Sequence, residues 1–167
     1  FSFKMIDKNF KKGCVLVVGG SGGIGSLCAE EFANAGAKVA ITYYQNKQAA
    51  IDLVSKIDSD AQIYKLDNKD SKSVEATINK VIKEFGSINT IVNAAGFDIP
   101  QKLIGEIDID LWKSVMDADI NGFFNLVNFG LPQLRKSKGS MVFISSAGLF
   151  KYPPGDVLSV APKATIE

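Results

Sequence analysis

The chain has 167 residues, 46% of them hydrophobic and 22% charged, and its 19 basic and 18 acidic side chains leave a net charge of +1. This length corresponds to about one domain, and the balanced charge argues against a nucleic-acid binder or a polybasic membrane anchor. The absence of histidine excludes Ser-His-Asp and Cys-His hydrolysis and histidine-ligated zinc. Two cysteines are too few for a disulfide framework or a four-cysteine metal site. We therefore expect no metal, no membrane or nucleic-acid partner, and a cytoplasmic protein.

Short apolar runs alternate with longer amphipathic stretches along the chain. The first run, CVLVV, ends in glycines as a buried parallel strand does. The later amphipathic segments carry apolar residues at helical spacing, as in Ala50, Leu53, Val54 and Ile57. In chain order we predict strand 14–18, helix 26–36, strand 38–43, helix 48–57, strand 62–66, helix 73–86, strand 89–93, helix 108–136 and strand 139–145.

A last helix is predicted from the position of Pro162. Proline is best tolerated in the first turn of a helix, where its missing N–H is no loss. We therefore expect this helix to begin near Ser159, whose hydroxyl would cap it.

This alternation of strands and helices predicts βαβ units, which build a parallel sheet covered on both faces. Residues 1–12 are predicted to be an N-terminal extension, and residues 13–167 one doubly wound α/β domain.

A glycine-rich loop, GGSGGIG, joins the first strand to the first helix. Strand, glycine turn and helix together are the context of a dinucleotide-binding loop, in which backbone N–H groups and the helix N-terminus face a pyrophosphate. The alternative is a flexible turn that binds nothing. The loop residues predicted to bind a cofactor are Gly19, Ser21, Gly22, Gly23, Ile24 and Gly25.

The spacing of Gly19, Gly23 and Gly25 resembles the GxxxGxG loop of the short-chain dehydrogenase/reductase family. Asp67, which ends the third strand, is similarly placed to an adenine-contacting Asp of that family. Three further segments resemble family motifs in the same order: NAAG at 93–96, WKSVMDADINGFF at 112–124 and FISSAG at 143–148.

The resemblance implies a Rossmann-like sheet of order 3-2-1-4-5, an NAD(P)-dependent oxidoreductase, and a homodimer or homotetramer. It also implies two more strands after Glu167, so we expect the domain to be C-terminally incomplete in this chain. The cofactor contacts that it implies beyond the glycine loop are Asp67, Asn68, Asn93, Ala94, Ala95, Gly96 and Lys163.

The second strand ends in Tyr43, which is followed by Tyr44, at the place where an acidic residue would bind the ribose of NAD and repel the phosphate of NADP. With no carboxylate there, the sequence favours NADP over NAD. Lys47 is a candidate for the phosphate, although a solvated lysine at a helix start explains it equally well.

Two of four catalytic positions depart from the family pattern. Ser146 matches the serine that binds the substrate oxygen, and Lys163 matches the lysine that holds the ribose. Ser159 stands where the family has its proton-donating tyrosine, and Asp119 stands where it has an asparagine. Asn121, two residues on, would point to another side of the helix. Tyr152 is a candidate substitute donor, although a turn aromatic packed beside proline is the commoner role.

Two functions remain open from the sequence. The first is an oxidoreductase that exchanges hydride between a nicotinamide cofactor and a small carbonyl or alcohol, with Tyr152, Asp119 or water moving the proton. The second is a catalytically inactive relative that serves as a nucleotide-binding or regulatory subunit.

Overall fold

The computed structural model describes residues 13–96 and 99–167, so the predicted extension at 1–12 lies outside the described residues. Five strands form one sheet in the order β3-β2-β1-β4-β5, and every neighbouring pair is parallel. The strands are β1 (Cys14–Val18), β2 (Lys38–Tyr43), β3 (Ala61–Lys65), β4 (Ile88–Asn93) and β5 (Ser140–Phe143). The predicted order is confirmed, and the strand ends differ from the predicted ones by at most two residues.

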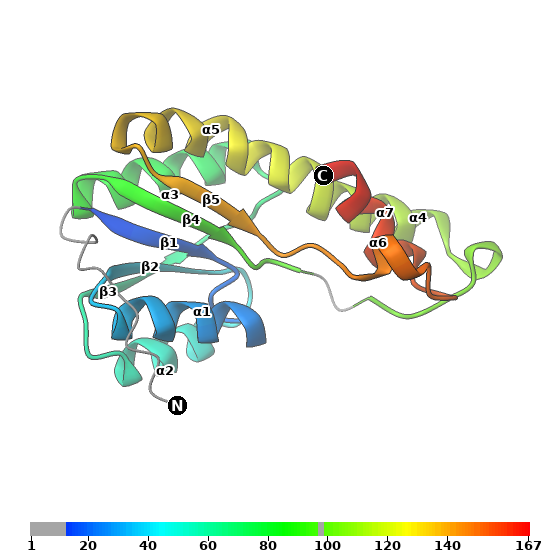
Figure 1. Cartoon of the computed structure of the whole chain (residues 1–167), viewed down its shortest axis with the longest axis horizontal. Coiled ribbons are helices and arrows are strands. Elements are labelled where there is room, and N and C mark those ends of the chain that lie inside the picture. Colours follow the sequence, from blue (N-terminus) through cyan, green and yellow to red (C-terminus); the bar gives the residue numbers. More distant parts are fainter. Residues whose placement is uncertain (1–12, 97–98) are drawn as a thin grey trace.

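Helices cover both faces of this sheet (Figure 1). Helices α1 (Gly23–Asn34) and α2 (Lys47–Lys56) lie on one face, and α3 (Ser71–Phe85) and α5 (Gly122–Ser137) lie on the other. The short elements η1 (Ile104–Glu106), α4 (Ile109–Met116), α6 (Gly148–Lys151) and α7 (Val157–Ile166) gather at the end toward which the strands run. None of the helices within 13–96 and 99–167 is long and apolar enough to cross a membrane.

The central strand β1 explains why two layers of helix are needed, because all five of its residues are buried. Successive side chains of a strand point to opposite faces. Cys14, Leu16 and Val18 accordingly enter the core beneath α3 and α5, whereas Val15 and Val17 enter the core beneath α1 and α2.

The long helix predicted over 108–136 is present as one helical run with an interruption. Asp108 caps its start, since the Asp108 carboxylate accepts hydrogen bonds from the N–H groups of Asp110 and Leu111 at 2.8 and 3.2 Å. Between α4 and α5 the chain forms a π-helical segment, η2 (Asp117–Asn121). Such segments insert an extra residue into the turn and often occur at functional sites.

The helices begin one to three residues away from the predicted starts, and two of these differences bear on predicted residues. Helix α1 begins at Gly23, inside the glycine loop, rather than at Ser26. Helix α7 begins at Val157, so Ser159 lies in its first turn and is not its cap. Pro162 consequently lies in the body of α7, where it has no N–H to donate to the helix and where its ring is buried. The prediction failed because it placed Pro162 in the first turn, whereas burial holds the proline further along the helix.

Candidate cofactor and active site

The glycine loop folds tightly on itself at the end of β1. Gly19 has a φ of +76°, a conformation that favours glycine. Its carbonyl accepts a hydrogen bond from Gly22 N–H at 3.0 Å, and its own N–H donates to Thr42 Oγ1 at 3.0 Å. The loop is thereby tied to the end of β2, and it delivers the chain directly into α1.

Gly23 and Gly25 serve different purposes. A Cβ on Gly25 would lie 2.3 Å from the carbonyl oxygen of Gly19, so this glycine lets α1 approach the loop. A Cβ on Gly23 would meet nothing within 4 Å, so the space beside the first residue of α1 is open. Gly22, the N-cap residue, makes no side-chain cap. The first N–H groups of α1 therefore face a space in which an anion can bind.

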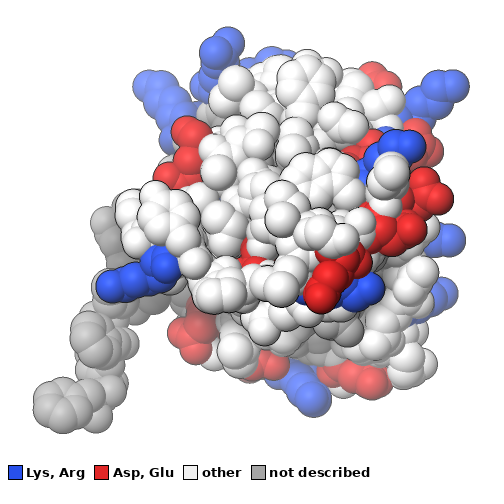
Figure 2. All heavy atoms as spheres, turned by 90° about the vertical axis from the view of Figure 1, so that its right-hand side faces the viewer, with Lys and Arg blue, Asp and Glu red and all other residues white. Residues whose placement is uncertain are grey.

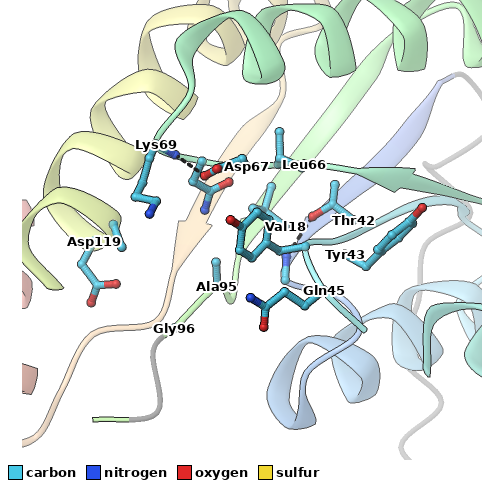
Figure 3. A pocket seen from close by; sticks show the side chains of 14 residues that line it. Val18, Thr42, Tyr43, Gln45, Leu66, Asp67, Lys69, Ala95, Gly96 and Asp119 are labelled. Atoms are coloured by element: carbon cyan, nitrogen blue, oxygen red, sulfur yellow. Dashed lines mark hydrogen bonds between the residues drawn. The ribbon is translucent and has the colours of Figure 1, made fainter. Parts of the chain in front are cut away.

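A crevice of ≈ 280 Å³ opens where the strands of the sheet end (Figure 3). Ligands of open α/β sheets bind at this edge, beside the point where the strand order reverses. In this sheet β1 lies between β2 and β4, which places the reversal at the glycine loop. The crevice is lined by Val18, Gly19, Thr42, Tyr43, Tyr44, Gln45, Leu66, Asp67, Asn68, Lys69, Ala95, Gly96, Ala118 and Asp119.

The predicted cofactor residues divide into two groups. Those that line the crevice are Gly19, Tyr43, Tyr44, Asp67, Asn68, Ala95 and Gly96. Those that do not line it are Ser21, Gly22, Gly23, Ile24, Gly25, Lys47, Asn93, Ala94 and Lys163. Lys47 is exposed at the first position of α2, after Asn46, whose side chain accepts from Ala49 N–H at 3.0 Å.

Asp67 is held by its own turn. Asp67 Oδ1 accepts a hydrogen bond from Lys69 N–H at 3.0 Å, and Asp67 N–H donates to Ser73 Oγ at 3.1 Å. Helix α5 supports the same turn, because Asn125 Nδ2 donates to the carbonyl of Asn68 at 2.9 Å. The wall of the crevice formed by Asp67 and Asn68 is therefore fixed by two helices, α3 and α5; Figure 3 shows the hydrogen bond between Asp67 and Lys69 in this turn.

The π-helical segment brings Asp119 against Lys163. Asp119 Oδ2 lies 3.4 Å from Lys163 Nζ, with side chains 7% and 15% exposed. Asn121 turns away, as predicted, and its Nδ2 donates to Asp117 Oδ1 at 2.8 Å on the exposed side. Two of the candidate catalytic residues thus form a shielded ion pair that joins η2 to α7, a pairing that the sequence did not predict.

Ser146 follows β5, and a hydrogen bond from a backbone N–H group orients its hydroxyl. Its Oγ accepts a hydrogen bond from Gly148 N–H at 3.1 Å. A hydroxyl has one proton and two lone pairs, so this bond leaves the proton available for donation to another oxygen.

The other two candidate catalytic residues, Ser159 and Tyr152, are not held by a described partner in this way. The Ser159 hydroxyl, in the first turn of α7, makes no hydrogen bond with any described residue. Tyr152 ends α6 in a left-handed conformation with φ +47°, and its side chain is 79% exposed. Tyr152 lines a second cavity, beside α7, and not the crevice that Asp119 lines.

Several lining residues were missed by the sequence analysis. They are Val18, Thr42, Gln45, Leu66, Lys69 and Ala118. Each is the immediate neighbour of a predicted residue, at the end of a strand or on η2. The signal that would have found them is the general position of ligands at the carboxyl ends of parallel strands.

Comparison with known proteins shows to which protein family this chain is similar. A family model described as short chain dehydrogenase matches residues 13–166. The 3-oxoacyl-[acyl-carrier-protein] reductase FabG of Staphylococcus aureus is 32% identical over 155 residues, which cover 90% of this chain and 63% of the relative. The sorbose reductase SOU1 of Candida albicans is 38% identical over 140 residues, 78% of this chain and 48% of the relative. The chain therefore spans between about half and two thirds of the length of these relatives.

Proposed function

Because the chain belongs to the short-chain dehydrogenase family, we propose that it binds a nicotinamide dinucleotide and exchanges hydride with a small carbonyl or alcohol. The two relatives above are named as reductases of a 3-oxoacyl thioester and of a sugar, both of which are carbonyl compounds. The observation that carries the proposal is the open glycine loop at the strand ends, next to a crevice that is lined by the candidate residue Asp119.

The residues present fit such a cofactor. The uncapped start of α1 and the open space beside Gly23 suit a pyrophosphate. The fixed turn at Asp67 and Asn68 is proposed to hold the adenine, and Tyr43 and Tyr44 to border its ribose. The other contacts proposed on the resemblance are Ser21, Gly22, Ile24, Gly25, Asn93, Ala94, Ala95, Gly96 and Lys163.

The preference for NADP remains part of the proposal. No carboxylate occurs from Tyr43 to Lys47, so nothing at the end of β2 repels a 2′-phosphate. Lys47 is the proposed cation for that phosphate, and its exposed place at the start of α2 leaves its ammonium free to move.

When bound, the nicotinamide supplies or accepts the hydride. We propose that the Ser146 hydroxyl donates a hydrogen bond to the substrate oxygen and keeps its proton, which its bond from Gly148 N–H allows. Lys163 is proposed to hold the ribose while Asp119 fixes its ammonium. Since Asp119 is already paired and Tyr152 is 79% exposed, water is the best supported of the three proton donors.

The second candidate function is a non-catalytic, cofactor-binding subunit. It is favoured by the same ion pair, because a lysine neutralised by Asp119 no longer favours ionisation of a neighbouring proton donor. It is also favoured by Ser159, because a serine hydroxyl is a poor general acid.

We further propose a homodimer or homotetramer, since Phe124 and Leu131 leave 65% and 38% of their surface exposed on α5. A cytoplasmic location is proposed because both cysteines, Cys14 and Cys28, are unpaired.

The test separates these functions. Titration of NADPH and NADH, followed by cofactor fluorescence, is expected to show binding with tighter binding of NADPH. Oxidation of NADPH is then measured against aldehydes, ketones and sugars. Cofactor binding without turnover of any compound would contradict the oxidoreductase and leave the non-catalytic subunit.

The variant Ser159→Tyr tests whether the proton-donating tyrosine is the only catalytic group that the site lacks. If the scaffold is otherwise competent, we expect the rate of hydride transfer to rise on the order of 10²-fold, the usual contribution of a general acid. The matched control is Ser159→Phe, which adds the same ring without the hydroxyl. An equal rate in the two variants would show that the tyrosine position no longer takes part in catalysis.

A further inference from the structure

An acidic side chain to which the family resemblance gives no role lies beside Ser146. Asp156 is the N-cap residue of α7, where an Asp side chain usually accepts a hydrogen bond from an N–H of the first turn. The Asp156 carboxylate makes no such bond. The backbone carbonyl of Asp156 takes that place, accepting from the N–H groups of Ser159 and Val160 at 3.0 Å each. Within the described part of the chain, the carboxylate has no hydrogen-bond or ion-pair partner.

The carboxylate and the Ser146 hydroxyl border the same small space. A methyl group placed on Gly148 would lie 3.1 Å from Ser146 Oγ and 3.3 Å from Asp156 Oδ2. The same methyl would lie 2.5 Å from Val160 Cγ2, so a side chain there would collide with α7. Glycine at 148 therefore lets the carboxylate come close to the hydroxyl that is proposed to bind the reacting oxygen.

Asp156 also borders a cavity of ≈ 360 Å³ between η1, the loop after α6 and α7. Its lining is mainly apolar and includes Leu103, Ile104, Val157 and Val160, with Lys102 as its one basic residue among those described. The end of the molecule that carries these elements shows a broad uncharged surface bordered by charged side chains (Figure 2). A carboxylate in apolar surroundings costs free energy unless it gains hydrogen bonds.

We propose that Asp156 determines substrate specificity by accepting a hydrogen bond from a hydroxyl or a protonated amine on the carbon next to the reacting carbon. The inference rests on the proposed function, because that function places the reacting oxygen at Ser146. An ionised carboxylate only accepts hydrogen bonds, so it selects substrates that carry a donor at this position. It opposes substrates that carry a carboxylate there, because like charges repel.

Four ketones that share one apolar body provide the probes. Acetophenone carries no substituent beside the carbonyl, 2-hydroxyacetophenone carries a hydroxyl, 2-aminoacetophenone carries an amine, and phenylglyoxylate carries a carboxylate. Dissociation constants are measured by calorimetry, with the cofactor-free protein and with NADP⁺ present, so that turnover is not needed. We expect the hydroxyl and amine probes to bind about tenfold tighter than acetophenone, as a charge-assisted hydrogen bond allows, and phenylglyoxylate to bind most weakly.

The variant Asp156→Asn keeps the shape and removes the charge. It is expected to remove the preference for the amine, to lessen the preference for the hydroxyl, and to relieve the penalty on phenylglyoxylate. The matched control is Asp58→Asn, which removes an exposed carboxylate in the loop after α2. The control is expected to keep the order of the four probes, and circular dichroism verifies that both variants fold.

The outcomes are distinguishable. The inference is supported if the order of the probes depends on Asp156, whether or not the cofactor binds. It is overturned if wild type and Asp156→Asn bind the four probes in the same order, or if no probe binds in either state. Failure of NADP⁺ and NADPH to bind, seen in separate titrations, contradicts the proposed function alone.

Discussion

At the scale of the residue, the two glycines of the loop differ in what a side chain would meet. A Cβ on Gly25 would meet the backbone of Gly19, whereas a Cβ on Gly23 would meet nothing within 4 Å. A side chain on Gly25 would collide with the carbonyl of Gly19 and push α1 away from the loop, so Gly25 has its effect through the fold.

We therefore expect Gly25→Ala to lower the free energy of unfolding by about 1–3 kcal/mol, the usual cost of overpacking. Gly23→Ala is expected to leave it unchanged or to raise it by about 0.4–1 kcal/mol, because alanine restricts the unfolded chain. Urea unfolding of both variants measures the difference. Equal losses of stability would contradict the assignment of these roles.

The buried thiol of Cys14 makes the free energy of unfolding depend on pH. Burial raises the pKa of its thiol to about 12, and the nearby Asp60 carboxylate adds to this effect while Lys38 opposes it. Since the folded state favours the protonated thiol, this contribution to stability is complete below the thiol pKa of the unfolded chain, about 8.5. It is lost progressively as the pH rises above that value toward 12.

Urea unfolding at pH 7, 9 and 10 is therefore expected to show a decline in stability that is smaller in Cys14→Ala. In a thiol assay at pH 8, the native protein is expected to expose Cys28 but not Cys14, and the denatured protein to expose both. Rapid reaction of both thiols in the native state would contradict the burial of Cys14.

At the scale of the element, the Asp119–Lys163 pair joins η2 to α7. Removing one partner leaves the other as an unpaired charge that is shielded from water. In buried ion pairs this lowers the free energy of unfolding by about 3 kcal/mol. We expect Asp119→Asn and Lys163→Met to have this effect, and the double variant to lose less than the two together, with a coupling of about 1–3 kcal/mol.

The Lys38–Asp60 pair serves as the control, because its atoms are 3.1 Å apart while its side chains are 51% and 50% exposed. A coupling of about 0–1 kcal/mol is expected there. Couplings of equal size in the two pairs would show that the Asp119–Lys163 pair is not shielded in solution.

The elements that the sequence predicted well are those with a strong local pattern. The five strands and the helical run predicted over 108–136 are confirmed to within two residues, although the π-helical segment η2 interrupts that run. The strand order, which the family resemblance implied, is confirmed as well. The π-helical segment was not predicted, because the apolar pattern indicates a helix over this stretch without showing at which turn an extra residue is inserted. The ion pair was missed for another reason, because Asp119 and Lys163 are far apart in sequence and lie on different elements, η2 and α7. The start of α7 was misplaced because a local rule for Pro162 was applied where tertiary burial decides.

At the scale of the whole molecule, the described sheet has two edges, β3 and β5. On β5 the side chain of Val142 is 47% exposed. An edge strand with exposed apolar side chains pairs readily with other chains, and a lysine on such an edge opposes this pairing.

We expect Val142→Lys to reduce self-association of this 167-residue chain, measured by light scattering, while the free energy of unfolding changes by less than about 0.5 kcal/mol. Ile51→Lys, which places the same charge on the exposed face of α2, is the control and is expected to leave scattering as in wild type. Equal effects of the two lysines would mean that net charge, and not the strand edge, governs association.

The position of β1 in the middle of the sheet also determines the order in which the molecule can form during synthesis. β1 pairs with β2, which follows soon after it, and with β4, whose residues 88–93 are made much later. Until β4 is made, the five buried residues of β1 have a sheet neighbour on one side only. Long-range parallel pairing of this kind is slow and leaves apolar surface accessible in the meantime. The nascent chain is therefore most in need of protection by chaperones while the segment from β2 to β4 is being made.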